Sequence, residues 1–196
     1  ALNNINHIDS ILHANSVGDN SSDNATYNIN YQFTRNQSLL NIDLDYGQYH
    51  LKDLRDQPNR YFAADDKTFL SESNNSINTA RDIDIYTAKL DYETSWKKIR
   101  LDFGSKYSLV KTDNLFRFYD GLQGEDPVFN DRRSNRFEYS EQVIAFYTNV
   151  QHQFNDVWAV SAGLRSETSD VSGDLRPFLP ELQEPSVEQK YTNLFP

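Results

Sequence analysis

The chain has 196 residues, of which 37% are hydrophobic and 13% aromatic, and its 19 basic and 29 acidic side chains give a formal net charge of −10. A mean hydropathy of −0.76, with no apolar run near the roughly 18 residues of a spanning helix, excludes a helical membrane protein. A pI of about 4.8 without a Lys/Arg cluster argues against nucleic acid as a partner. Cysteine is absent, which excludes disulfides and thiolate metal sites, and we expect no cofactor.

The predicted elements begin after a polar leader. Residues 1–24 are rich in Asn, Ser and Asp, which predicts a loop. From Ala25 onward, apolar and polar residues alternate with the period of a two-faced strand, and a hairpin is predicted at about 25–50. The same pattern recurs in hairpins at about 83–110 and 136–170.

The segments between these hairpins lose the period of two. Pro, Gly, Asn and Asp residues accumulate there, and long loops are predicted at about 52–79, 111–135 and 171–190. Residues 191–196 resemble the opening of a further strand. Residues 25–196 therefore form one all-β unit, an antiparallel up-and-down meander of about six strands.

The predicted connections alternate between a few residues and about twenty. A compact soluble sandwich has no reason for that alternation, whereas outer-membrane barrels have short periplasmic turns and long extracellular loops. Strands of about twelve residues, at ~3.3 Å per residue and tilted by roughly 45°, rise about 28 Å, close to the hydrocarbon thickness. The pattern predicts a segment of a large β-barrel in the outer membrane.

The two faces of the predicted strands differ in polarity. One face is apolar. The other face carries charged side chains of both signs, such as Lys89, Asp91 and Arg100, as expected for a face that lines a water-filled lumen. Trp96 and Trp158 lie at short turns, and Tyr46, Tyr49, Tyr107 and Phe116 lie near long loops, as two aromatic girdles require. The residues predicted to face lipid are Tyr86, Leu90, Tyr92, Ile99, Leu101, Phe103, Ile144, Phe146, Val160 and Leu164.

Several short motifs in the second half of the chain resemble a known family. Phe137-x-Tyr139-x-Glu141, Ala145-Phe146-Tyr147, Gly163 to Thr168 and Tyr191 to Pro196 are similar to the barrel region of TonB-dependent receptor-like outer-membrane proteins, especially those common in Bacteroidetes. The resemblance implies a closed barrel that imports a scarce nutrient, with energy relayed by the inner-membrane protein TonB. No plug or TonB box is found in this sequence, so the chain is interpreted as part of the barrel wall.

No catalytic motif stands out, and we expect no enzyme. Asp43 and Asp45 share a strand face, which a lumen explains better than acid–base chemistry. His152 has no nucleophile motif nearby, and an outer-membrane hydrolase using it ranks last among the hypotheses. Binding residues concentrate on loops, so candidate contacts for an unknown imported ligand are Glu125, Asp126, Asp131, Arg132 and Arg133.

A soluble all-β module that binds a ligand or glycan is the alternative to the barrel wall. An isolated six-stranded piece leaves two unpaired edges, which lipid does not tolerate. We therefore expect outer-membrane lipid as a partner of the complete barrel, and self-association through edge strands for the isolated segment.

Overall fold

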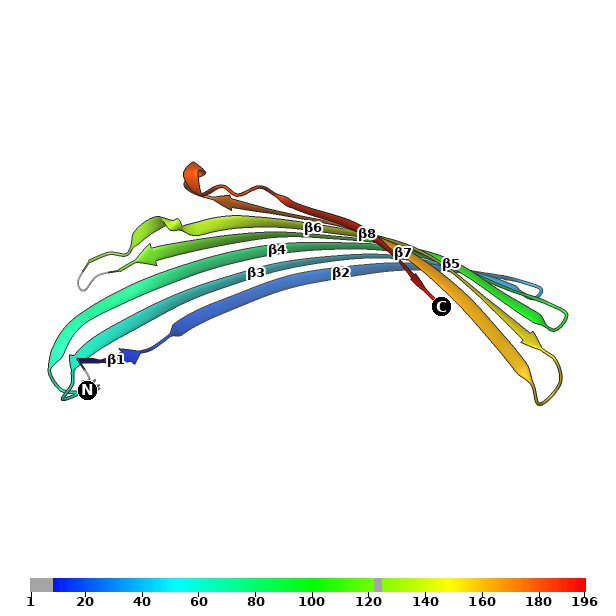
Figure 1. Cartoon of the computed structure of the whole chain (residues 1–196), viewed down its shortest axis with the longest axis horizontal. Helices are drawn as coiled ribbons and strands as arrows, with labels where there is room; N and C mark the ends of the chain where they lie inside the picture. The colour runs from blue at the N-terminus through cyan, green and yellow to red at the C-terminus, as the bar shows by residue number, and fades with distance from the viewer. Residues whose placement is uncertain (1–8, 122–124) are drawn as a thin grey trace, which may run out of the picture.

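The computed structural model describes residues 9–121 and 125–196, and within them the fold is a single antiparallel sheet (Figure 1). The strand order is β1-β3-β4-β5-β6-β7-β8, and β2 also pairs with β3. A 3-10 helix, η1 (Pro180–Leu182), lies between the last two strands. The strands are β1 (Ser10–Ala14), β2 (Val17–Arg35), β3 (Ser38–Ala63), β4 (Phe69–Trp96), β5 (Ile99–Asp120), β6 (Val128–Gln153), β7 (Ala159–Pro177) and β8 (Val187–Phe195).

The predicted all-β antiparallel meander is confirmed, with eight described strands in place of about six. The sheet is long and bent, and hairpin turns gather at both of its ends (Figure 1). At one end the turns are short, with Asn36-Gln37 joining β2 to β3 and Lys97-Lys98 joining β4 to β5. Among the described residues, no helix is long and apolar enough to cross a membrane.

The predicted long loops are largely wrong, because the strands continue through them. Most of 52–79 is strand in β3 and β4, and much of 111–135 belongs to β5 and β6, although 122–124 lie outside the described residues. The first part of 171–190 is the end of β7. The pairing of β3 with β4 is continuous from Ser38 opposite Thr94 to Tyr61 opposite Ser71, so the connection between them is only residues 64–68.

The alternation of apolar and polar residues breaks off in these segments for a reason other than the presence of a loop. In β3 the apolar residues from Leu40 to Tyr46 alternate at even positions, and the alternation resumes at the odd positions Tyr49 and Leu51, while the register with β4 does not slip there. A shift of one residue moves the apolar set to the opposite face of a strand. The sheet therefore continues while its apolar side changes face, and a search for one unbroken alternation misses the second half of each strand.

The prediction that the polar leader is a loop is also wrong for most of its described part, residues 9–24. β1 and most of the first half of β2 pair with the far end of β3, from Ser10 opposite Ala63 to Asn24 opposite Tyr49. Asn, Ser and Asp have low strand propensity, but backbone pairing with a neighbouring strand overrides it. Residues 1–8 of the predicted leader lie outside the described residues.

The isolated 196-residue segment is expected to self-associate. In the described part of the chain, β2 and β8 each pair with one neighbour only, which leaves a row of unpaired backbone groups on each outer edge. Sedimentation in water at increasing concentration is expected to show dimers or larger species. A strict monomer at every concentration would contradict this expectation.

Candidate functional site

All ten residues that the sequence predicts to face lipid lie on one face of the sheet, here called the outer face. The register aligns Leu90 of β4 with Ser105 of β5 and Phe146 of β6 in one row, and Tyr92 with Phe103 in the next. Phe146 is 62% exposed and Val160 57% exposed. The described part of the chain therefore leaves these two large apolar side chains largely uncovered on this face.

Aromatic rings bound the apolar part of the outer face at both ends. At one end Tyr27, Tyr46 and Tyr86 form a row, with ring centroids 6.2 Å apart for the first pair and 4.9 Å for the second. At the other end, beside the short turns, Trp96 and Trp158 are exposed. Tyr86 to Trp96 of β4 spans 11 residues, which matches the ~9–11 residues of a strand that crosses a bilayer.

Three of the rings predicted for the girdles lie outside the two aromatic rows, and one of them, Tyr107, lies on the outer face between the rows, opposite Ala88. The register places Tyr49 and Phe116 on the opposite, inner face, beyond the tyrosine row. Their positions in the sequence suggested a girdle because they lie close to the end of the apolar stretch. The change of face after Tyr46 is what directs them inward.

Between the aromatic rows, the inner face is polar and its side chains pair with one another. Lys89 lies 2.7 Å from Asp91, and the Tyr147 hydroxyl donates a hydrogen bond to Asp91. Arg100 contacts Glu93 at 2.6 Å and Asp102 at 3.1 Å. These pairs join strands β4, β5 and β6, and this face suits a water-filled lumen.

Gly104 lets the tyrosine of this network lie flat against the inner face. A Cβ at Gly104 would collide with the ring of Tyr147, which lies directly opposite it in β6. The glycine is thus required for the close approach that brings the Tyr147 hydroxyl to Asp91.

Beyond the tyrosine row, the two faces exchange character. The inner face becomes apolar there, and it carries Ile83, Ile85, Val110, Phe137 and Val171. The outer face becomes charged over the same length of strand. β4 alone continues for 17 residues past Tyr86, from Ile85 back to Phe69, which at ~3.3 Å per residue and a tilt of ~45° corresponds to a rise of about 40 Å.

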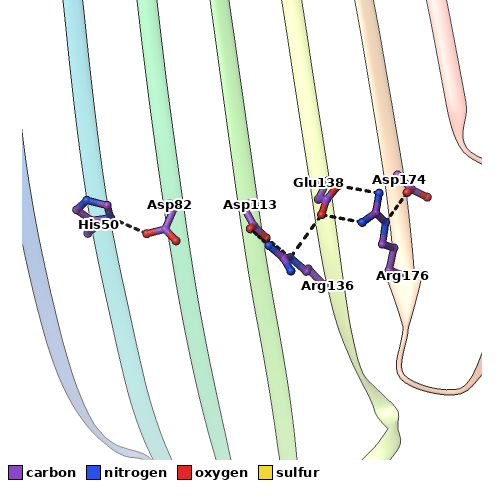
Figure 2. Close-up of polar contacts among 7 residues, drawn as sticks. All are labelled: His50, Asp82, Asp113, Arg136, Glu138, Asp174 and Arg176. Carbon is purple, nitrogen blue, oxygen red and sulfur yellow. Dashed lines mark hydrogen bonds and ion pairs between the residues drawn. The ribbon is translucent and has the colours of Figure 1, made fainter.

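The charged part of the outer face carries two sets of polar contacts, shown in Figure 2 and together called the ladder, whose residues lie on five neighbouring strands. His50 of β3 lies 2.6 Å from Asp82 of β4. The second set is a chain of ion pairs from β5 to β7, which joins Asp113, Arg136, Glu138, Arg176 and Asp174.

Arginine lies at the centre of the ladder because its planar group binds two carboxylates at once. Arg136 binds Asp113 through both Nε and Nη2, and Arg176 donates to Glu138 at 2.9 Å and to Asp174 at 2.7 Å. The hydrogen bonds from Arg136 hold the pKa of Asp113 below its ordinary value, and Asp113 in turn raises the pKa of Arg136. Carboxylates held this way by residues of a neighbouring strand help to keep adjacent strands in register.

Acidic pH is expected to loosen this part of the sheet. Since the pKa of Asp113 is lowered in the folded state, its stabilising contribution is complete above the ordinary carboxyl pKa of about 4 and is lost as the pH falls through the lowered value. The protection of the β5 and β6 amides near Asp113 against hydrogen exchange, taken relative to the intrinsic exchange rate at each pH, is expected to fall below pH 4.

The matched comparison uses two asparagine variants. Asp113→Asn is expected to exchange faster already at neutral pH and to lose most of the acid-dependent step. Asp126→Asn, at an exposed carboxylate without an ion pair among the described residues, is expected to behave as the parent. Equal behaviour of the two variants would contradict the role of the ladder.

The five candidate ligand contacts cluster at the far end of the sheet. Glu125 and Asp126 lie in the connection between β5 and β6. Asp131, Arg132 and Arg133 lie near the beginning of strand β6. All five are exposed. The Arg133 guanidinium stacks 3.4 Å from the centre of the Phe118 ring and pairs with Asp120 at 3.5 Å, so it already has a structural partner.

The aspartates and the histidine that were considered as candidate catalytic residues contact neighbouring side chains. Asp43 and Asp45 accept hydrogen bonds from Asn30 and Asn28 across the β2–β3 pair. His152 packs on Phe154 with ring centroids 4.4 Å apart, and its Nδ1 has no hydrogen-bond partner. Over residues 9–121 and 125–196, no group of three or more His, Asp or Glu side chains is arranged to hold a metal ion.

Sequence reasoning missed the ion-pair ladder and the apolar inner face beyond the tyrosine row. Both lie in segments predicted as loops, so their residues were not assigned to faces. A usable signal was present in β3, where Tyr49 and Leu51 alternate with His50 and Lys52 directly after the first alternation ends.

The comparisons with known proteins agree with this two-faced wall. A search of curated proteins finds no match. The family description "Outer membrane protein beta-barrel family" matches residues 7–196, nearly the whole chain. This chain therefore belongs to an outer membrane protein β-barrel family, and its sheet is a wall located in the outer membrane.

Proposed function

We propose that this wall is part of a TonB-dependent receptor-like transporter that imports a scarce nutrient. The observation that carries the proposal is the polar, internally paired inner face between the aromatic rows, built around Asp91 and Arg100. A wall with an apolar outside and a hydrated inside is what a solute-conducting barrel requires. The protein acts in transport and not as an enzyme.

The part of the wall beyond the tyrosine row supports a receptor role. Its inner face offers aliphatic and aromatic side chains, including Ile83 and Phe137, to a molecule that enters from outside. Ligand pockets combine an apolar lining with a few polar groups. Glu125, Asp126 and Asp131 at the tips, together with Arg132 and Arg133, supply such polar groups at the entrance.

Membership of an outer-membrane family removes the support for a soluble binding module. The low mean hydropathy that favoured it follows from the construction of the sheet. Only the outer face between the aromatic rows is apolar toward lipid, and long charged extensions dilute the average.

Growth competition tests the proposed import. A strain that lacks this protein is compared with its parent in media limited in turn for complexed iron, cobalamin, oligosaccharide or peptide. We expect a defect in one medium that is equally large in a strain without TonB, with no further loss when both are absent. No defect in any medium, or a defect that adds to the loss of TonB, would overturn the proposal.

A further inference from the structure

The outer face contains a slot in its apolar part. Ala88 of β4 and Ser105 of β5 are small residues in adjacent rows, and larger side chains stand around them, namely Leu44, Leu90, Tyr107 and Phe146. The resulting hollow measures about 310 Å³. It lies between the aromatic rows on the face that meets lipid, so the occupant continuous with that interface is a hydrocarbon chain.

A polar hollow of about 550 Å³ lies on the same face just beyond the tyrosine row. Lys111 lines it, on the same strand and the same face as Ser105. Lys111 lies six positions after Ser105, about 20 Å along the strand, or ~14 Å of depth at a tilt of ~45°. That depth is about half of a ~30 Å hydrocarbon core, which is the reach of one leaflet.

The polar hollow contains a negatively and a positively charged side chain that lie next to each other, Asp84 and Lys111. Asp84 and Lys111 lie directly opposite each other in β4 and β5, yet the two side chains form no ion pair with each other. Asp84 accepts the Tyr46 hydroxyl at 2.7 Å and has a second oxygen for another donor. By contrast, Arg176 in the same hollow is already held by Glu138 and Asp174.

We propose that this stretch of the outer face is a binding site for one membrane lipid, with an acyl chain in the slot over Ala88 and Ser105 and a headgroup that carries both phosphate and ammonium at Lys111 and Asp84. The phosphate accepts from Lys111, and the ammonium donates to Asp84. A headgroup with negative charge only fits less well, because the hollow is also lined by Asp82, Asp113 and Glu188.

Competitive lipid binding tests the headgroup. The intact protein, purified in detergent, is mixed with equal amounts of phosphatidylethanolamine and phosphatidylglycerol of the same acyl chains, and bound lipid is counted by native mass spectrometry. We expect about tenfold more phosphatidylethanolamine, and a ratio near one for Lys111→Gln and for Asp84→Asn. Lys52→Gln, at an outer-face lysine outside the hollow, keeps the parental ratio.

A second pair of variants tests the slot. Ser105→Phe fills it and is expected to lower retention of both lipids about tenfold, whereas Thr148→Phe, on the same face but outside the slot, leaves retention unchanged. Altered electrophoretic mobility on heating checks that each variant is folded. Equal or stronger binding of phosphatidylglycerol by the parent, stronger binding of an added glycolipid, or equal effects of the two phenylalanines would overturn the proposal.

Discussion

Replacing Leu90 with arginine is expected to destabilise the folded protein by about 2–4 kcal/mol, while the same replacement at Leu54 costs about 0–1 kcal/mol. Both leucines lie on the outer face, and both are exposed, Leu90 by 41% and Leu54 by 52%. Leu90 lies between the tyrosine and tryptophan rows, and Leu54 lies beyond the tyrosine row beside the charged ladder. The difference between the two losses of unfolding free energy therefore reports whether lipid or water surrounds the outer face at each position, and not the loss of a protein contact.

The cost at Leu90 comes from placing a guanidinium group in hydrocarbon, where no water solvates it. Urea unfolding from phospholipid vesicles, followed by the fluorescence of Trp96 and Trp158, measures the two free energies of unfolding. An equal loss at both positions would contradict the placement of the bilayer between the aromatic rows. A larger loss at Leu54 would place the bilayer on the extension.

A single cysteine at Ser172 is expected to react fully with a membrane-impermeant maleimide on intact cells, while a cysteine at Thr148 does not react. The chain has no cysteine of its own, so each substitution introduces one thiol. Ser172 lies on the outer face beyond the tyrosine row, in the same row across the sheet as Ser140 and Lys111. Thr148 lies on the same face between the aromatic rows, opposite Phe103. Water and reagent reach the first position, and lipid covers the second.

The same pair of cysteines tests the orientation of the wall. Short turns at the end near Trp96 are typical of the periplasmic side, which places Ser172 outside the cell. If Ser172→Cys reacts only after the outer membrane is permeabilised, the orientation is reversed. If Thr148→Cys reacts on intact cells, the face between the aromatic rows does not meet lipid. Labelling of both after denaturation is the control for thiol reactivity.

The sequence predicted the part of each strand that lies between the aromatic rows. There the apolar residues keep one phase, as at Leu40, Ile42 and Leu44, and lipid on one side with water on the other imposes that alternation. For this reason the ten residues predicted to face lipid share one face of the sheet, and the charged residues lie on the other. The short turns near Asn36 and Lys97 were predictable because each is a brief polar break between two clearly alternating segments, and in the structure both residues have a positive φ angle.

The extensions beyond Tyr46 and Tyr86 were not predictable in the same way. With the bilayer placed between the aromatic rows, as predicted above, neither face of the extensions meets lipid and the solvent imposes no single apolar side. The apolar residues change face there without any bulge at that point. Residues such as Asn74, Asn75 and Ser76 have little strand propensity of their own. Only pairing with β3 and β5 makes them strand.

Composition and alternation by themselves determined that this acidic, cysteine-free chain is all-β and that its strands have one apolar side, since a period of two is a local property of strand geometry. The tertiary structure decided how far that wall extends, because strand pairing joins residues that no local pattern relates. It also decided which charges meet, joining His50 to Asp82 and Arg136 to Asp113 while leaving Lys111 and Asp84 without an ion pair between them. Register across the sheet, and not spacing along the chain, sets those contacts.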